Sequence, residues 1–206
     1  MAVCHWQDYL FGTTRSPLKS LDKAIDFAKR AVAQDDGLPE AHQVLGILYI
    51  YNREYEKGLA EGERAVDLCP NGVEPLQIYA TCLLLVGRTN EAVSLFEKSI
   101  RLNPKGSFSN FHNYGHALRY SGRFDDAILA YKKALLSVPN NIHSHLGLTA
   151  TYSLMGWEEE AQAQAKEVIR INPEFLIDNL IRILPYRDQS LVEKYYYNPL
   201  RKAGLK

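Results

Sequence analysis

Apolar residues recur with the period of an α-helix in short blocks along this chain, and each block ends at a glycine or a proline. The clearest block runs from residue 108 to 141, FSNFHNYGHALRYSGRFDDAILAYKKALLSVPNN. Its first half puts residues at i, i+3, i+4 and i+7 on one helix face, namely Phe111, Tyr114, Gly115 and Leu118. Gly122 is expected to end that helix, and Pro139 to end a second one. The block therefore predicts two antiparallel helices.

The same block is repeated along the chain. Prolines that end a second helix stand at Pro70, Pro104, Pro139 and Pro173, with separations of 34, 35 and 34 residues. A single helical hairpin of this size cannot bury its apolar face, so it needs copies of itself as neighbours. The spacing predicts an all-α solenoid over residues 1–173, with a degenerate first repeat and four full repeats. Their expected bounds are 1–38, 39–72, 73–107, 108–141 and 142–173.

The two ends of the chain depart from this rhythm. Near the start, a truncated helix is expected to present Trp6, Tyr9, Leu10 and Phe11. After Pro173, residues 174–206 predict capping helices for the solenoid, the first over residues 174–183. A last helix is expected from about Gln189 to Ala203, with Asp188 as its N-cap and Pro199 bending or shortening it.

The period and its motif resemble the tetratricopeptide repeat (TPR) family, with its pattern W-x2-L-G-x2-Y…A-x3-F…P. Residues at the L-G-x2-Y positions are Leu45, Gly46 and Tyr49; Tyr79, Ala80 and Leu83; Tyr114, Gly115 and Leu118; and Leu148, Thr149 and Tyr152. The resemblance implies a right-handed superhelix that binds proteins. The first full repeat departs from the pattern, because Gly58 and Gly62 replace an alanine and an aromatic residue, so we expect looser packing there. In the fourth repeat, Ala165 replaces the aromatic residue.

The C-terminal tail carries a narrower resemblance. It is similar to the ending of the TPR regions that lie C-terminal to class III adenylate/guanylate cyclase domains in bacteria. The similar residues are Leu184-Pro185-Tyr186-Arg187-Asp188 and Leu200-Arg201-Lys202-Ala203-Gly204-Leu205. The resemblance implies a regulatory module of a bacterial signalling protein, cut from a longer chain or acting beside another domain. No stretch is left over for a cyclase catalytic domain.

Composition limits the kinds of partner. Lys and Arg number 24 and Asp and Glu number 24, so the formal net charge is zero and no basic run offers a nucleic-acid surface. No stretch is long and apolar enough for a membrane span, and the start lacks the pattern of a signal peptide. Three cysteines without a CxxC pair favour reduced thiols. We therefore expect a cytoplasmic protein.

Catalytic chemistry finds little support. His112, His116 and His143 suggest a metal site, but HNYGH lacks the glutamate of H-E-x-x-H and no cysteine or carboxylate has a matching spacing. His42 and His145 take the first aromatic position of their repeats, where a ring packs. Nucleophile elbows and phosphate-binding glycine loops are absent from the sequence. We expect a non-enzymatic chain that needs no cofactor or metal.

Binding is the better hypothesis. The resemblance implies that the first helices line a concave groove that holds an extended peptide, a helix or a domain of the same parent chain. Its expected contact residues are Gln43, Ile47, Tyr51, Gln77, Thr81, His112, His116, Arg119, Tyr120 and His143. Some of these residues are alternatively explained by packing against neighbouring repeats or the C-terminal helix. A second hypothesis is a homo-oligomeric scaffold that docks through hairpin ends or through Tyr195, Tyr196 and Tyr197.

Overall fold

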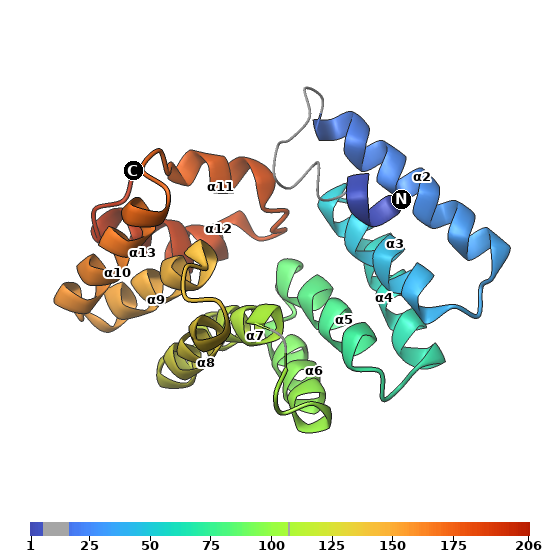
Figure 1. Cartoon of the computed structure of the whole chain (residues 1–206), viewed down its shortest axis with the longest axis horizontal. Coiled ribbons are helices and arrows are strands. Elements are labelled where there is room, and N and C mark those ends of the chain that lie inside the picture. Colours follow the sequence, from blue (N-terminus) through green and yellow to red (C-terminus); the bar gives the residue numbers. More distant parts are fainter. Residues whose placement is uncertain (6–16, 107) are drawn as a thin grey trace.

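The computed structural model describes residues 1–5, 17–106 and 108–206 (Figure 1). These residues form helices joined by short turns, and no strand occurs among them. The predicted apolar face of Trp6, Tyr9, Leu10 and Phe11 lies outside the described residues. The main helices are α2 (Pro17–Gln34), α3 (Pro39–Tyr51), α4 (Tyr55–Leu68), α5 (Val73–Leu85), α6 (Thr89–Leu102), α7 (Phe108–Tyr120), α8 (Phe124–Ser137), α9 (Ile142–Met155) and α10 (Glu158–Ile171).

Successive helices pack as antiparallel pairs that stack into an arc, the all-α solenoid that the repeats predict. Each of the four full pairs, from α3/α4 to α9/α10, also contacts its neighbouring pair along the chain. In Figure 1 the arc runs from α2 to α10, with α5 and α7 on its inner side and α6 and α8 on its outer side. The first helices are buried on most of their faces, whereas α4 and α10 bury one narrow stripe each. The first helices therefore form both the core and the inner wall.

Tyr131 shows why small residues recur in the first helices. Its ring is fully buried on α8 and lies between Gly115 of α7 and Gly147 of α9. A Cβ atom added at Gly115 would come within 2.7 Å of the ring, and one added at Gly147 would overlap it further. One aromatic side chain thus fixes the contact between two successive pairs, because neither first helix carries a side chain there.

The first full pair is closely packed, which corrects the expectation of looseness. A Cβ atom at Gly46 of α3 would lie 3.0 Å from the backbone oxygen of Gly58 and 3.0 Å from the backbone nitrogen of Gly62. The space that an aromatic residue would fill at Gly62 is taken by Tyr79 of the next pair, 2.7 Å from the added Cβ atom. The glycines let the two helix backbones meet directly, and added side chains would clash there.

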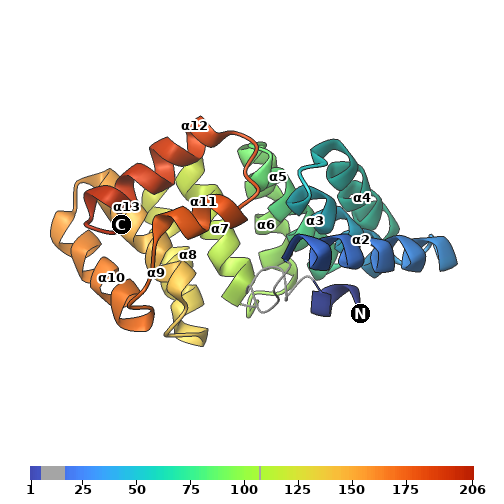
Figure 2. The same cartoon turned by 90° about the horizontal axis from the view of Figure 1, so that it is seen from above.

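The C-terminal segment, residues 177–206, has four helical parts: α11 (Ile177–Ile183), α12 (Gln189–Val192), η1 (Glu193–Tyr197) and α13 (Asn198–Lys202). α13 packs against α9, as a cap would, and Lys202 pairs with Glu158 at the start of α10. The rest of the segment follows the inner side of the arc (Figures 1 and 2). At its far end the Arg187 N–H donates to the Leu85 carbonyl of α5 at 2.9 Å. The segment therefore covers part of the concave face as well as contacting the last helix pair.

The last helix has the predicted cap and a defined irregularity. Asp188 accepts a hydrogen bond from the Leu191 N–H at 3.0 Å. Residues Glu193–Tyr197 form one π-helical turn, in which the Asn198 N–H reaches the Glu193 carbonyl. Pro199 follows at once, and its missing N–H and its ring disturb the regular α-helical register one turn earlier. The proline is accommodated by this wider turn, and the helix continues to Lys202.

We expect Gly147→Ala to destabilise the protein by about 1–3 kcal/mol, because the new methyl group overpacks Tyr131. In an unobstructed helix the same change would stabilise by about 1 kcal/mol, so the sign separates the two effects. Urea denaturation followed by circular dichroism measures the difference. Ser137→Ala, at an exposed position of α8, serves as the control, with a change within about 0.5 kcal/mol. A more stable Gly147→Ala variant would show that Tyr131 does not constrain the packing of α8 against α9.

Candidate partner-binding groove

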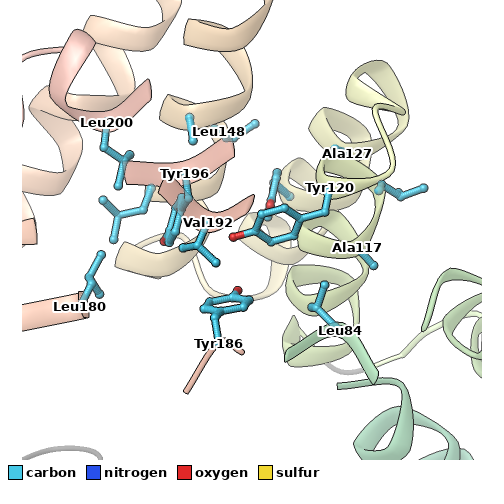
Figure 3. Close-up of a cluster of buried hydrophobic side chains, with 14 of the residues drawn as sticks. Leu84, Ala117, Tyr120, Ala127, Leu148, Leu180, Tyr186, Val192, Tyr196 and Leu200 are labelled. Atoms are coloured by element: carbon cyan, nitrogen blue, oxygen red, sulfur yellow. The ribbon is translucent and has the colours of Figure 1, made fainter. Parts of the chain in front are cut away.

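The predicted groove strip on α7 is covered by the C-terminal segment. His116, Arg119 and Tyr120 are all buried, and Arg119 has no exposed surface at all. Figure 3 shows Tyr120 beside Tyr186 and Tyr196, which come from the C-terminal segment. This corrects the picture of an open polar strip. The residues do gather in one place, but their contacts are with this chain's own C-terminal segment.

Aromatic rings enclose the guanidinium of Arg119. Its Cζ atom lies 4.4 Å from the ring centre of Tyr196 and 5.0 Å from that of Tyr120. One nitrogen, Nη2, donates to His116 Nδ1 at 2.7 Å. The Nε and Nη1 groups are buried and have no hydrogen-bond partner among the described residues. The cation is therefore held by ring faces and one imidazole, and no carboxylate of the described ranges pairs with it.

Arg119 sets the proton positions on the neighbouring histidines. Because a guanidinium only donates, His116 Nδ1 must accept and the His116 proton resides on Nε2. That N–H points at His112 Nε2, 3.1 Å away, which must then accept in turn. The remaining nitrogen of His112, Nδ1, lies 3.3 Å from the Ser144 hydroxyl of α9. The result is a directed chain of hydrogen bonds that needs both imidazoles neutral.

Burial and charge act on these histidines in the same direction. Burial, followed by the charge of Arg119, holds the pKa of His116 well below its usual range. The pKa of His112 is also well below its usual range, through burial first and then through His143 and Arg119. The groups facing this pair are Tyr131 and Tyr196 on His116, with Tyr131 and His143 on His112. Both imidazoles are therefore neutral near pH 7.

The far end of the C-terminal segment is held by Tyr186 and Arg187. The Tyr186 ring is buried 5.7 Å from the ring of Tyr120. Arg187 pairs with Glu56 at 2.6 Å and lies over the ring of Tyr55, both at the start of α4. This ion pair is exposed and contributes little by itself. Burial of Tyr186, and the backbone bond to Leu85, are the stronger attachments.

The other predicted groove residues lie in different surroundings. Gln43 and Ile47 are buried, and Tyr51, Gln77 and Thr81 are partly buried. Thr81 accepts a hydrogen bond from Asn113 of α7 at 3.2 Å, so it joins two repeats. His143 is exposed, with its ring 6.0 Å from that of His112. These residues therefore do not share one open surface with the α7 strip.

Sequence reasoning missed the residues that fill the groove. The main ones are Tyr186, Val192, Tyr196 and Leu200, all buried against the solenoid. The sequence does contain a signal for them. The last helix has more apolar positions than a helix that leaves one whole face to solvent. Val192, Tyr196 and Leu200 recur every four residues, and Tyr197 and Ala203 widen the stripe.

The described part of the chain contains neither a group of metal-ligating side chains nor a membrane-spanning helix. No group of three His, Cys, Asp or Glu side chains within residues 1–5, 17–106 and 108–206 could hold a metal ion. The Nε2 atoms of His112 and His116 are hydrogen-bonded to each other. His42 and His145 are buried and bonded within their repeats, to Glu61 and to Gln164. No helix in the described ranges is long and apolar enough to cross a membrane.

Two of the helix pairs match a known repeat family. The tetratricopeptide repeat model matches residues 74–105 and 109–141, which correspond to α5/α6 and α7/α8. The human PEX5-related protein is 30% identical over 94 residues, which is 46% of this chain and 15% of that protein. The small glutamine-rich tetratricopeptide repeat-containing protein 2 of Mycosarcoma maydis is 26% identical over 119 residues, 57% of this chain and 34% of that protein. The chain thus spans only a minor part of the length of these relatives.

Solved structures share the fold over most of the chain. A thermophilic TPR protein of Thermus thermophilus aligns with a TM-score of 0.68 and 21% identity, over 86% of this chain and 96% of that chain. PilW, a type IV pilus biogenesis factor, aligns with a TM-score of 0.71 and 18% identity, over 94% and 90%. YrrB, a TPR protein with an unusual peptide-binding site, aligns with a TM-score of 0.60 and 19% identity, over 84% and 89%. At these identities the likeness establishes the fold alone.

We expect the free energy of unfolding to fall as the pH drops below about 6.5, the usual pKa of histidine in an unfolded chain. Unfolded His112 and His116 take up protons there, whereas the folded pair stays neutral because its pKa values are depressed. Stability is thus complete above this pH and lost as the pH falls towards the folded pKa values. Urea denaturation between about pH 7.5 and 5.5 measures the loss.

His116→Gln is the control for this pH dependence, since its amide oxygen can still accept from Arg119. The variant should lose stability less steeply on acidification, with about one proton fewer taken up on unfolding. An unchanged slope in the variant, or a native protein whose stability does not depend on pH in this range, would refute the buried neutral pair.

Proposed function

Because two helix pairs match the tetratricopeptide repeat and the whole fold is that of TPR proteins, we propose that this chain is a non-catalytic protein-interaction module. Its concave groove binds a peptide, a helix or a partner domain. TPR proteins mediate protein–protein interactions, so the general role follows from the repeats. The site on α7 and α9, and its regulation, are the specific parts of the proposal.

The main support for this proposal is that the C-terminal helical segment lies on the inner side of α7 and α9. It brings Tyr196 against His116 and Arg119, and η1 and α13 contact α9. A groove that buries one amphipathic helix of its own chain has the shape and the apolar surface to bind another. The C-terminal segment therefore acts as an internal occupant that a partner has to displace.

We place this module in a cytoplasmic bacterial signalling protein, as a regulatory region. The support is the tail similarity to regions next to class III cyclase domains, together with the position of that tail in the fold. Tyr186 lies against Tyr120, and Leu200 and Leu205 are buried. One of the similar residues, Tyr186, is thus among those that cover the groove. A displaceable cover on a domain beside an enzyme is a simple means of regulation.

Self-assembly is the second candidate function. Leu129 and Leu136 on α8 are 66% and 85% exposed, and they are seven residues apart on one face of the helix. In contrast, Tyr196 and Tyr197 are buried within this chain, so they offer no free surface to another copy while the segment is docked. Assembly would use the outer leucines or an exchange of C-terminal segments between copies.

Loosening the internal occupant should strengthen binding in the groove. We expect peptides selected from a random displayed library to bind the full-length Tyr196→Ala variant about tenfold or more tightly than the native chain. The reason is that Tyr196 is one of the largest fully buried side chains of the competing segment. Fluorescence anisotropy measures both affinities, and circular dichroism checks that the variant is folded.

Lys194→Ala, at an exposed position of the same helix, is the matched control and should leave the affinity unchanged. Failure to select any peptide with either protein, or equal affinities for the native chain and Tyr196→Ala, would count against a groove regulated by its own tail.

Light scattering over a concentration series tests the alternative. We expect the native chain to remain a monomer, because the C-terminal segment is docked in its own groove. A dimer that disappears in the Leu129→Gln, Leu136→Gln double variant would instead favour assembly through α8.

A further inference from the structure

We propose that the groove recognises a partner segment bearing a carboxylate, which takes the place of Tyr196 and pairs with Arg119. The inference rests on the proposed function, and adds to it the chemical class of the partner and the residue that selects it. The native occupant presents an aromatic ring to the guanidinium, 4.4 Å from Cζ to the ring centre. An acidic side chain at the same place would present two acceptor oxygens instead.

Several buried polar groups around Arg119 lack hydrogen-bond partners. Arg119 Nε and Nη1 have no hydrogen-bond partner in the described part of the chain, and neither have the buried hydroxyls of Tyr120 and Tyr131. Tyr131 lies next to the same histidine that Arg119 bonds, with its ring 5.5 Å from that of His116. The guanidinium can only donate, and a hydroxyl can donate as well as accept. A carboxylate, which only accepts, is complementary to this set of groups.

The arrangement is costly to keep without a ligand. A cation removed from water loses its hydration, and ring faces and one imidazole compensate for this only in part. Buried groups left without partners are rare in folded proteins, and each calls for an explanation. A residue that is unfavourable in the closed state and satisfied in the bound state gives the partner an advantage over the tail. Arg119 would therefore weaken the tail and strengthen an acidic competitor.

The tail itself shows how a competitor would reach Arg119. The last helix brings the side chain of residue 196 directly over the guanidinium, and Val192 and Leu200 are buried one turn before and one turn after it. A partner helix with a Glu or Asp between two apolar residues, each four positions away, would keep these apolar contacts and add the ion pair. The expected motif is thus an acidic residue within an apolar helical stripe.

The experiment is a double-mutant cycle in the full chain. Tyr196→Glu and Tyr196→Gln are compared in the native background and with Arg119→Met. We expect Tyr196→Glu to have an unfolding constant about ten- to a hundredfold smaller than Tyr196→Gln at neutral pH, because the carboxylate pairs with Arg119. With Arg119→Met the advantage of Glu should vanish or reverse. Arg119→Met alone should fold and be at least as stable as the native chain.

A Tyr196→Gln variant as stable as Tyr196→Glu, or a Glu advantage that persists with Arg119→Met, would overturn the proposal. Arg119→Gln replaces Arg119→Met in the cycle if the latter does not fold. The library peptides give the second readout, in the Tyr196→Ala background. Their acidic residues should be enriched, and replacing these with amides should weaken binding about tenfold or more only when Arg119 is present.

The two readouts separate this inference from the proposed function. Selected peptides that bind in the groove without any acidic preference would leave the interaction module intact and overturn the carboxylate site. A positive cycle, followed by loss of peptide binding on exchange of the acids for amides, supports both.

Discussion

The buried guanidinium of Arg119 is the constraint around which the inner face of this solenoid is arranged. It donates to His116, which fixes the tautomers of two neutral histidines and links α7 to Ser144 of α9. Tyr196 of the C-terminal segment covers it with a ring face. Removing the cation from water is unfavourable, and the surrounding aromatic contacts offset only part of that cost. The segment is therefore held by burial of its apolar side chains more than by polar pairing.

This balance connects the architecture with the proposed role. The wedge of Tyr131 between Gly115 and Gly147 makes the wall of the groove stiff, since no side chain separates the helices there. The occupant is less regular, because it contains short helices, a π-helical turn and Pro199 within its last helix. Because the repeats are closely packed and the C-terminal segment is less regular, we expect the groove to open by release of this segment while the repeats remain paired.

The repeats could be predicted from the sequence because their signals are local. A proline stop and a 3.6-residue period recur every 34 or 35 residues, with a glycine turn in three of the four full repeats, and these signals specify each hairpin. The contact between Tyr196 and Arg119 joins residues far apart in the chain, and no local pattern encodes which face of the tail meets which repeat. The predicted strip of His112, His116, Arg119 and Tyr120 does gather in one place, but packing against the C-terminal helix was only the alternative explanation, and the sequence could not decide for it. The close backbone contact at Gly46 was missed for a similar reason, since Tyr79 of the next repeat fills the space.

Native-state hydrogen exchange tests the central claim, that the C-terminal segment opens while the repeats stay folded. The backbone amides of residues 191–203 should exchange through a local opening, with protection well below that of the buried parts of α7 and α9. Tyr196→Ala should lower the protection of this segment further and leave the protection of the α7 and α9 amides in place. Equal protection of the segment and the two repeat helices, lost together in the variant, would contradict a displaceable occupant and make the segment an inseparable part of the solenoid core.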